Sequence, residues 1–596
     1  MLKRTHMCGD LRDEHIGETV VVAGWVNTYR DQGKGLLFID LRDRAGIGQV
    51  VFDLEDANSD VVQAARMLRR EDVIAARGVV RTRVGGPNPK LATGTIEVMA
   101  TELEVLNKTE TPPILPDDYE ASKIAPEKRL QYRYIDLRRP RMQQILRTRH
   151  EVARTARTYF AEHGFIEVET PCLIKTTPEG ARDFVVPSRS YPGQWYALPQ
   201  SPQIFKQILM VSGCDRYLQI VRCFRDEDPR ADRQAEFTQI DLEMSFVDRD
   251  DVMAMMGGLA KRLWKEVLDV ELGEIPVLSY HDAMERYGID RPDLRFGLEI
   301  EDVSDLAAKT DFKVFQDALA KDRGVVKAMR VPGGAEKLTR KLTDDYTKWI
   351  RTFRAGGVPV VKLTANGFET GIAKFLGPIA DALRERLELE EGDTVLFTAD
   401  TWSIATKAIG ELRNRVARDL DLVEEGTWKM LWVVDFPMFE RDEDQERWVA
   451  LHHPFTAPRT DQFDELERAP GECISAAYDL VCNGSEIAGG SIRIHRPDVQ
   501  RKVFELLGIG AEEAEQKFGF LLKALRFGAP PHGGIAFGLD RLVMLLAGTD
   551  DIKDVIAFPK TQTGQDLMTE APAPVDAEQL EELHVRVVVP EVVEPV

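Results

Sequence analysis

The 596-residue sequence lacks the features that mark secreted and membrane proteins. It contains no run of about 18 apolar residues, so no membrane-spanning helix is expected. The N-terminal stretch MLKRTHMCGDLRDEHIG has no apolar segment of the signal-peptide kind. The six cysteines are scattered without a CxxC pair, which argues against a zinc knuckle or a disulfide framework. We therefore expect a cytoplasmic protein with reduced thiols and no membrane partner.

Positive charge is also scarce. Lys and Arg total 78 against 100 Asp and Glu, and the formal net charge is −22. This balance weakens the case for a nucleic-acid partner without excluding it, because salt confines each charge contact to about 10 Å and one basic face is enough. The hydrophobic content of 43% is ordinary for a globular protein. The length predicts roughly three to four domains.

The N-terminal part of the sequence predicts a small β-barrel. Strand-like stretches lie at 20–29, 36–41, 48–54, 72–84 and 95–106, with a helical stretch at 60–70 after the third. This is the pattern of an oligonucleotide-binding (OB) barrel, although another small barrel would fit as well. Trp25, Arg30, Phe38, Arg42 and Gln49 lie on the strands expected to bind. Exposed aromatic and amide groups there can stack and read an unpaired base, but Phe38 could instead belong to the core.

Composition and predicted secondary structure change several times along the rest of the sequence. A proline-rich acidic connector leads into the basic stretch RLQYRYIDLRRPRM, which either contacts a polyanion or is a solvated linker. A helix from 141 to about 163 precedes a strand that ends at Pro171. Strand–helix alternation between 291 and 422 predicts an α+β insertion in the main sheet. The predicted division is 1–108, 109–140, 141–290, 291–422, 423–562 and a C-terminal extension at 563–596.

The stretch 217–246 predicts two strands joined by a charged, arginine-rich loop. In the second strand Ile240, Leu242, Met244 and Phe246 alternate with Gln239, Asp241, Glu243 and Ser245. Period-2 alternation indicates one buried face and one polar face. Carboxylates beside arginines could hold both a cation and a polyanion, whereas a solvated hairpin tip would explain the loop's charges equally well.

A second informative stretch is 476–495. Asp479 and Glu486 are predicted to lie on neighbouring strands joined by the Asn483-Gly484 turn. Two carboxylates there suit a Mg²⁺ ion that also takes phosphate oxygens, although ordinary surface charges would look the same. His452 and His453 are adjacent in sequence, so they should point in opposite directions and form a poor metal pair.

Two predicted helices carry candidate charges. One should begin at Pro202 with Ser201 as its N-cap, leaving Gln203 and Lys206 off the buried stripe. The other follows the glycine-rich strand at 533–538. Its residue Arg541 lies in the first turn, where the helix dipole opposes a cation. Arg541 is therefore better explained by an anionic ligand than by helix stability.

Three motifs occur in order: the helix and strand ending at Pro171, FRDE (224–227) and GLDR (538–541). PEGARD, QSPQIFKQ, FTQID, HHPFT, AGGS and RIH lie between them. With these motifs the chain resembles the class II aminoacyl-tRNA synthetases of subclass b, most closely the bacterial-type aspartyl enzymes. The resemblance implies an α+β multidomain fold. It would contain an N-terminal OB-fold β-barrel, an antiparallel class II sheet flanked by helices, and an inserted GAD-like domain.

The resemblance also implies an activity. A homodimer would activate L-aspartate with ATP and Mg²⁺ and transfer it to the 3′ end of tRNA(Asp). A close variant would be a relaxed enzyme that also charges tRNA(Asn). Gln32 stands where the family usually has Leu or His, in a loop one residue longer than usual, which leaves tRNA discrimination open. A non-catalytic RNA-binding paralogue would lack one of Arg225, Glu486, Arg493 or Arg541, and all four are present.

Site residues follow from the resemblance position by position. Arg225 and Arg541 would be the catalytic cations. L-aspartate would be bound by Glu179, Ser201, Gln203, Lys206, Arg225, Asp241, His452 and Arg493. ATP would be bound by Arg225, Asp226, Glu227, Gln234, Phe237, Glu486, Gly538, Leu539, Asp540 and Arg541. Mg²⁺ would be bound by Asp479 and Glu486. The tRNA anticodon would be contacted by Arg30, Gln32, Phe38 and Gln49. Two departures, Ala235 for a usual proline and Ala488 for a usual glycine, change no ligand side chain.

Overall fold

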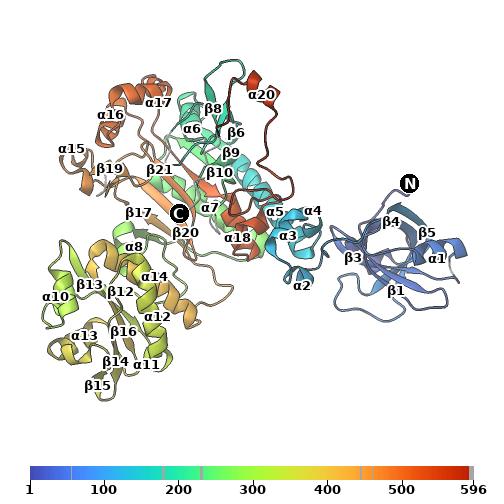
Figure 1. Cartoon of the computed structure of the whole chain (residues 1–596), viewed down its shortest axis with the longest axis horizontal. Helices are drawn as coiled ribbons and strands as arrows, with labels where there is room; N and C mark the ends of the chain where they lie inside the picture. Colours follow the sequence, from blue (N-terminus) through green and yellow to red (C-terminus); the bar gives the residue numbers. More distant parts are fainter. Residues whose placement is uncertain (56, 178–180, 228–232, 443–445, 461, 589–596) are drawn as a thin grey trace. The chain divides into compact units, whose positions relative to one another are not determined.

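A computed structural model describes all residues of the protein except 56, 178–180, 228–232, 443–445, 461 and 589–596 (Figure 1). The chain divides into two compact units. The first is formed mainly by Met1–His150 and Thr549–Pro574, and the second mainly by Glu151–Asp228 and Ala235–Gly548. Helix α5 (Pro140–Glu162) begins in the first unit and ends in the second.

The N-terminal barrel of the first unit is closed. Its strands follow the order β1-β2-β3-β5-β4. They are β1 (Thr19–Asp31), β2 (Leu37–Asp43), β3 (Gly46–Phe52), β4 (Val73–Thr82) and β5 (Ile96–Asn107), with α1 (Ser59–Arg66) after the third. This confirms the predicted OB-type barrel. Leu37 and Ile39 are fully buried in its core while Phe38 is half-buried, so Phe38 lies on the outer face of β2 rather than in the core.

The predicted connector contains three short helices, α2 (Asp118–Ala121), α3 (Pro126–Gln131) and α4 (Arg133–Asp136). Two of its arginines have structural partners within the first unit. Arg133 is buried, pairs with Asp136 and donates to the carbonyls of Lys553 and Ile556. Arg138 donates to Glu71 at 2.9 Å and lies over the Trp25 ring. Arg133 thus has a structural role, while Arg138 remains partly exposed.

The second unit is built on an eight-stranded sheet with the order β11-β17-β20-β21-β22-β10-β9-β6. Its strands are β6 (Ile166–Glu167), β9 (Arg216–Phe224), β10 (Glu236–Ser245), β11 (Val277–Ser279), β17 (Met430–Val434), β20 (Ala477–Cys482), β21 (Ser485–Ile492) and β22 (His532–Gly538). Neighbouring strands are antiparallel except at the two ends, where β6 joins β9 and β11 joins β17 in parallel. The antiparallel sheet expected from the motifs is therefore present.

Strand β10 follows the predicted alternation with one correction. Ile240, Leu242 and Met244 are buried as expected, but Phe246 lies beyond the strand and is 73% exposed. On the polar face, Asp241 and Glu243 are also buried. Helix α6 (Gln203–Val211) covers that face and brings Lys206 to both carboxylates.

Helix α6 begins one residue later than the sequence predicts. Pro202 occupies the N-cap position, and no side chain caps the helix. The hydroxyl oxygen of Ser201 accepts a 3.3 Å hydrogen bond from the Gln203 backbone N–H. Ser201 therefore supports the start of the helix from the position before the cap.

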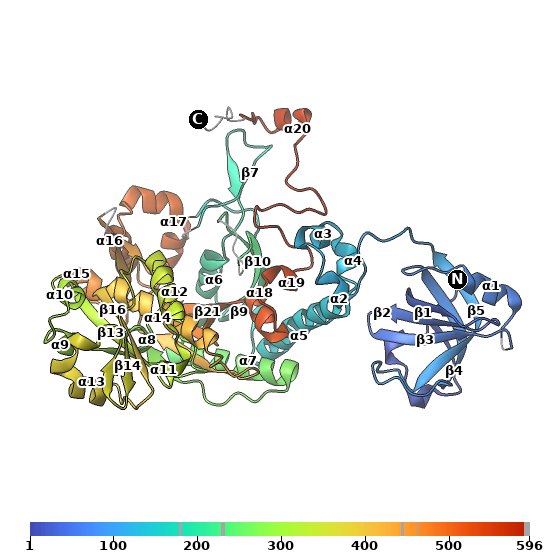
Figure 2. The same ribbon diagram turned by 60° about the horizontal axis from the view of Figure 1, so that its bottom comes forward.

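The predicted insertion forms a separate five-stranded sheet with the order β12-β13-β16-β14-β15 (Figure 2). Its strands are β12 (Ile300–Asp302), β13 (Gly324–Val331), β14 (Val360–Thr364), β15 (Gly367–Glu369) and β16 (Thr394–Thr401). Its helices are α9 (Ser304–Ala307), α10 (Lys313–Leu319), α11 (Gly334–Lys337), α12 (Arg340–Ile350), α13 (Ala380–Arg386) and α14 (Trp402–Asp419). Two hydrophobic clusters share the sheet: one contains Met329 and Leu412, and the other contains Phe315 and Phe397.

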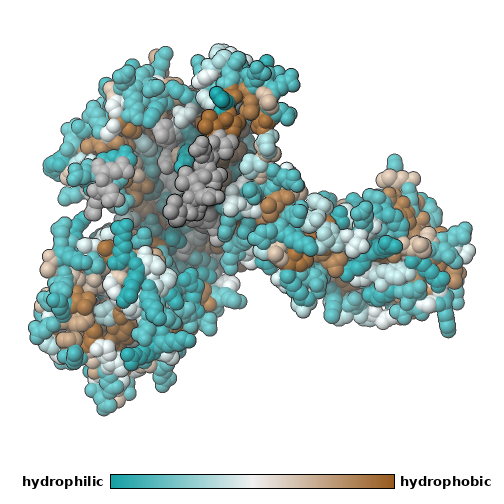
Figure 3. All heavy atoms as spheres, viewed as in Figure 1, coloured by the Kyte–Doolittle hydropathy of each residue, from teal (hydrophilic) through white to brown (hydrophobic). Residues whose placement is uncertain are grey.

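The described residues also form eight further α-helices and two hairpins. The helices are α7 (Arg249–Leu268), α8 (Tyr280–Tyr287), α15 (Glu465–Arg468), α16 (Pro497–Leu506), α17 (Ala511–Leu525), α18 (Leu539–Ala547), α19 (Ile552–Val555) and α20 (Ala577–Glu582). Two hairpins pair β7 (Val185–Pro187) with β8 (Trp195–Ala197) and β18 (Phe439–Asp442) with β19 (Arg447–Ala450). Hydrophilic residues cover most of the face shown in Figure 3. Within the described residues, no helix has the length and apolar character needed to cross a membrane.

Strand β22 is glycine-rich where it crosses β10 and β21. Gly534 lies opposite Glu243 on one side and Ser491 on the other. A Cβ atom added to Gly534 would lie 2.0 Å from Glu243 Oε2 and 2.2 Å from the Leu242 carbonyl oxygen. The glycine thus provides the space that the Glu243 carboxylate occupies.

We predict that Gly534→Ala lowers the midpoint of thermal unfolding by several degrees, because the added methyl group overlaps backbone in a packed sheet and costs about 1–3 kcal/mol. Gly257→Ala in α7 is the matched control. Its Cβ would meet only Ile275 at 3.6 Å, and alanine is the better helix former, so its midpoint should stay or rise. Differential scanning calorimetry makes the comparison, and equal midpoints for the two variants would contradict it.

Candidate active site

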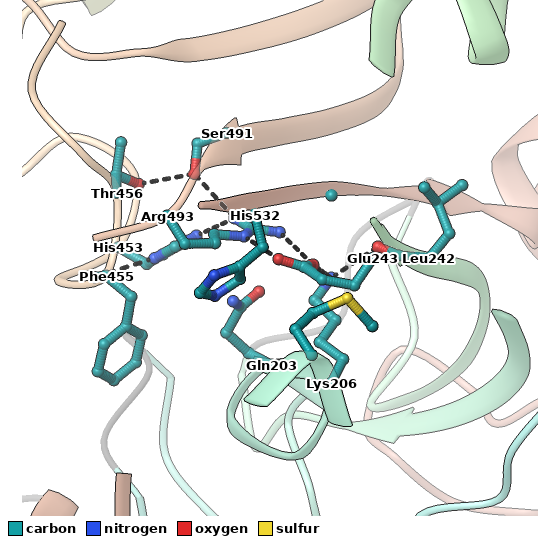
Figure 4. Close-up of polar contacts among 12 residues, drawn as sticks. Gln203, Lys206, Leu242, Glu243, His453, Phe455, Thr456, Ser491, Arg493 and His532 are labelled. Atoms are coloured by element: carbon teal, nitrogen blue, oxygen red, sulfur yellow. Dashed lines mark hydrogen bonds and ion pairs between the residues drawn. The ribbon is translucent and has the colours of Figure 1, made fainter. Parts of the chain in front are cut away.

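Four charged side chains meet on the polar face of β10, and Figure 4 labels three of them, Lys206, Glu243 and Arg493. Lys206 Nζ lies 2.8 Å from Asp241 Oδ1 and 3.3 Å from Glu243 Oε2. Arg493, which follows β21, donates from Nε and Nη2 to the two Glu243 oxygens at 2.9 and 3.1 Å. All four side chains are buried, and their formal charges cancel. Charges removed from water in this way need partners of opposite sign, and each has one here.

The two carboxylates of this cluster differ electrostatically. Burial raises the pKa of Asp241, and the nearby Lys206 opposes the rise only in part. For Glu243, burial alone would raise the pKa, but the charges of Arg493 and Lys206 outweigh it and lower the pKa. Glu243 is therefore the permanent anion of the cluster. Asp241 Oδ2 and Gln203 Nε2 are buried without a hydrogen-bond partner among the described residues, so a ligand with polar groups would satisfy them.

His453 lies beside this cluster. Burial lowers its pKa well below the usual value, and Arg493 adds to the effect, so the ring is neutral. Arg493 Nη1 can only donate and is 2.7 Å from His453 Nε2, so Nε2 is the acceptor of this hydrogen bond. Arg493 Nη1 also donates to Ser491 Oγ at 2.8 Å. His453 and Ser491 thus hold one nitrogen of the guanidinium, and Glu243 holds the other two.

His452 faces a different group. Its Nε2 is 3.7 Å from Asp479 Oδ1, while His453 contacts Arg493. The predicted divergence of the two histidines is confirmed, although they lie in a loop rather than a strand. Burial would lower the pKa of His452, but the neighbouring Asp479 carboxylate raises it.

Asp479 and Glu486 lie on β20 and β21, joined by the predicted turn at Asn483 and Gly484, which both have positive φ. Both carboxylates approach Gly489: a Cβ there would lie 2.9 Å from Asp479 Oδ1 and 3.2 Å from Glu486 Oε1. Burial, then the charge of Asp479, raises the pKa of Glu486 to about 7. In the described part of the chain, no group of three or more His, Cys, Asp or Glu side chains is arranged to hold a metal. A cation here would need oxygens from a ligand as well.

The arginines of the second and third motifs lie at the ends of β9 and β22. Arg225 Cζ is 5.1 Å from the centre of the Phe237 ring, and the Arg225 backbone N–H donates to the Ala235 carbonyl at 2.8 Å. Arg541 Nη1 donates to the Glu486 carbonyl at 2.8 Å. These contacts place Arg541 beside the carboxylate pair and Phe237 beneath a guanidinium, an arrangement that suits a planar base and its phosphates.

Other predicted ATP residues have structural contacts. Asp540 accepts from the buried Thr238 backbone N–H at 2.7 Å, Leu539 is in the core, and Gly538 is the N-cap of α18. Asp226 lies 3.8 Å from Arg182. Glu227 has a polar or electrostatic contact within the protein. The predicted ligand Glu179 lies outside the residues that the structure describes.

Two sets of predicted residues lie in the first unit. Gln234 exchanges hydrogen bonds with the Lys560 backbone. In the barrel, Arg30 donates to Asp40 and to Gln49, and Gln49 donates to the buried Glu97. Gln32 is exposed in the loop between β1 and β2. The predicted anticodon residues therefore include a connected pair, Arg30 and Gln49, with Phe38 on the same strand as Asp40.

Sequence reasoning did not single out Glu243, His453 or Ser491 as site residues. Ser491 Oγ accepts from Arg493 Nη1 at 2.8 Å and is 3.3 Å from Thr456 Oγ1. The alternation of β10 was a usable signal for Glu243, since it shares a face with Asp241. No signal in the sequence distinguishes His453 from its neighbour, because their roles depend on how a loop crosses the sheet.

The barrel, the antiparallel sheet and the ordered motif residues together define a class II aminoacyl-tRNA synthetase. The family described as tRNA synthetases class II (D, K and N) matches residues 125–562, and the OB-fold nucleic acid binding domain matches residues 20–106. The chain belongs to this family, and within it to the bacterial-type aspartyl-tRNA synthetases.

Individual relatives cover nearly the whole chain. The Aspartate–tRNA(Asp/Asn) ligases of Desulfatibacillum aliphaticivorans and Halothermothrix orenii are each 51% identical to it over 98% of this chain, and the alignments cover 98% and 99% of theirs. Among solved structures, the asparaginyl-tRNA synthetase of Pyrococcus horikoshii complexed with asparaginyl-adenylate has a TM-score of 0.58 and 19% identity, covering 94% of this chain and 99% of that one. At that identity the likeness concerns the fold alone.

We predict that Asp540→Ala destabilises the protein by about 1–3 kcal/mol, because it leaves the buried Thr238 N–H without its acceptor. Asp540→Asn retains an acceptor oxygen and should cost less. Urea unfolding followed by circular dichroism measures both. Stability equal to the unsubstituted protein in the Ala variant would show that this hydrogen bond contributes nothing.

Proposed function

We propose that the protein activates L-aspartate with ATP and transfers it to the 3′ end of both tRNA(Asp) and tRNA(Asn). The observation that carries the first half is the buried pair of cations, Lys206 and Arg493, beside the buried carboxylate of Asp241. An amino acid with an anionic side chain and an ammonium group needs both signs of charge in one pocket.

In this proposal the side-chain carboxylate of aspartate meets Arg493 and Lys206, and its ammonium group meets Asp241 Oδ2, Gln203 and Ser201. The first contact is supported by the proximity of the two buried cations, which both contact Glu243. The unpaired Asp241 Oδ2 supports the second. Asparagine would place an NH₂ group against these donors and leave hydrogen bonds unmade, so it should be rejected strongly.

The nucleotide would lie between Phe237, which stacks on adenine, and the cations Arg225 and Arg541, which face its phosphates. The family uses ATP. Asp479 and Glu486 fit a Mg²⁺ ion, because burial and then the charge of Asp479 raise the Glu486 pKa, and a cation would stabilise both carboxylates in their ionised form. When bound, Mg²⁺ supplies charge stabilisation to the phosphate oxygens.

The protein's own contribution to activation is positioning. Lys206, Arg493 and Asp241 hold aspartate by its two ends, so its α-carboxylate is presented to the α-phosphate for an in-line attack that breaks the α–β phosphoanhydride bond and releases pyrophosphate. Arg225 and Arg541 stabilise the charge that develops on the phosphoryl oxygens. The 3′-terminal hydroxyl of tRNA then attacks the carbonyl carbon of the aspartyl-adenylate, which forms the ester and releases AMP.

Relaxed tRNA use is the better supported of the two variants. Four relatives at 50–51% identity carry the name Aspartate–tRNA(Asp/Asn) ligase. Gln32, in the exposed loop of the barrel, departs from the residues usual at that position. Arg30, Gln49 and Phe38 remain the proposed anticodon contacts. We also propose a homodimer through the element that ends at Pro171, where β6 forms the sheet edge.

We predict that purified protein charges tRNA(Asp) and tRNA(Asn) with labelled aspartate at rates within about tenfold of each other, because an exposed hydrogen bond that water can replace contributes only about 0.5–1.5 kcal/mol. A tRNA with an unrelated anticodon is the control and should not be charged. Aspartate on tRNA(Asp) alone would restrict the proposal to a discriminating enzyme, and charging of neither tRNA would refute it.

We predict that Glu486→Gln raises the Mg²⁺ concentration for half-maximal aspartyl-adenylate formation at least about tenfold, because one of the two anionic oxygen ligands is lost. Asp498→Asn, which changes an exposed carboxylate paired with Arg496, is the control. ATP–pyrophosphate exchange across a Mg²⁺ titration measures both. An unchanged Mg²⁺ requirement in the Glu486 variant would exclude that residue as a ligand.

A further inference from the structure

We propose that Glu243 is the positioning residue that determines selectivity for a side-chain carboxylate, by holding Arg493 and Lys206 in the array that meets it. The inference rests on the proposed function, because it assumes that aspartate enters this pocket. Glu243 would not touch the substrate. It would act through the two cations that do.

One carboxylate bridges both cations. Glu243 Oε1 accepts from Arg493 Nε at 2.9 Å, and Oε2 accepts from Nη2 at 3.1 Å while lying 3.3 Å from Lys206 Nζ. A side-on bidentate contact fixes a guanidinium in its plane as well as in position. Without it, Arg493 could rotate about its last side-chain torsions, and Lys206 would keep only the Asp241 side chain as a charged partner.

The contact leaves one defined donor of Arg493 for a ligand. Glu243 occupies the edge formed by Nε and Nη2. Nη1 donates to Ser491 Oγ at 2.8 Å and to His453 Nε2 at 2.7 Å. Figure 4 shows the Glu243 carboxylate and the His453 ring on different sides of the guanidinium. The second hydrogen of Nη2 is therefore the donor that Glu243 orients for a carboxylate ligand.

The position of Glu243 is itself fixed by the sheet. Glu243 on β10 lies opposite Gly534 on β22, and Gly534 lies opposite Ser491 on β21. The three strands therefore align the Glu243 carboxylate, the space left by the missing Gly534 side chain, and Ser491, which accepts from Arg493. The Glu243 side chain is completely buried, and Tyr478 secures the neighbouring backbone by donating to the Gly534 carbonyl at 3.1 Å. A buried carboxylate with this little freedom is suited to setting the geometry of its partners.

Glu243 also sets the charge of the pocket. With Glu243 and Asp241 ionised, the two cations are balanced before aspartate arrives. Replacing Glu243 by glutamine would remove one anion and give its amide only one acceptor oxygen for two cations, while the NH₂ group would face the other cation. The array that binds a carboxylate bidentately would be lost. Asparagine does not bind through that array, so its kcat/KM would fall less than that of aspartate.

The test is Glu243→Gln in ATP–pyrophosphate exchange, with aspartate and asparagine as alternative substrates. We expect kcat/KM for aspartate to fall about 100-fold or more, as for other buried hydrogen-bonded charge pairs that lose one partner. The preference for aspartate over asparagine should fall by at least about tenfold, while KM for ATP stays within about threefold. A merely structural role would lower activity with both amino acids and leave their ratio unchanged.

The matched control is Glu299→Gln. Glu299 forms the same side-on contact with Arg286 Nε and Nη2, at 3.0 and 2.8 Å, but on the surface of the inserted region. It should leave both kinetic constants unchanged. If Glu243→Gln does not fold, as judged by circular dichroism, Glu243→Asp decides. It retains the charge but is one methylene shorter, so the aspartate preference should still fall by about tenfold.

An unchanged ratio of aspartate to asparagine in a folded Glu243 variant overturns the proposal. Failure of the unsubstituted protein to form aspartyl-adenylate would instead refute the proposed function, and the two results are read from separate samples in one experiment. Isothermal titration of each folded variant with aspartate gives an independent readout. Weaker binding of aspartate with unchanged binding of ATP supports the proposal, and unchanged binding of aspartate contradicts it.

Discussion

The buried contact between Glu243 and Arg493 is the constraint on which the catalytic sheet depends. Taking two charges out of water is costly, and the cost is recovered only when geometry is good and the remaining donors are satisfied. Here the remaining donors reach Ser491 and His453, and Lys206 joins the same carboxylate. Several sequence features follow from this requirement. Gly534 must lack a side chain, β10 must present carboxylates inward, and α6 must carry a lysine on the face that covers them.

The order of strands explains why residues far apart in the sequence can form one site. Strands β21, β22 and β10 are neighbours, so Arg493 lies beside Glu243 although 250 residues separate them in the sequence. The inserted α+β region falls between β11 and β17. These strands form the end of the sheet away from β9 and β10, so a long insertion can be accommodated there without separating the site strands.

Much of this fold could be predicted from the sequence. Period-2 alternation located β10, turn residues located the hairpin of β20 and β21, and five strands with one helix located the barrel. The errors share a physical cause. Alternation distinguishes two faces of a strand but not what covers each, so it did not indicate that α6 buries the polar face of β10. Phe246 fits the alternation yet lies past the strand at positive φ. The basic connector was read by composition, whereas Arg133 is buried against backbone carbonyls from a segment over 400 residues away.

The proposed function requires recognition of an amino acid by buried groups and recognition of a tRNA by exposed groups. The amino-acid pocket is buried and its charges are fixed by one another, so a change of sign or of hydrogen-bonding pattern in the ligand leaves groups unpaired where water cannot reach them. The barrel residues proposed to read the anticodon are partly exposed, and Gln32 lies in a solvent-facing loop. Contacts at such a surface can be replaced by water at small cost. Strict choice of the amino acid and tolerant choice of the tRNA are therefore compatible within one chain, because the first depends on a dry, charge-balanced core and the second on a wet surface.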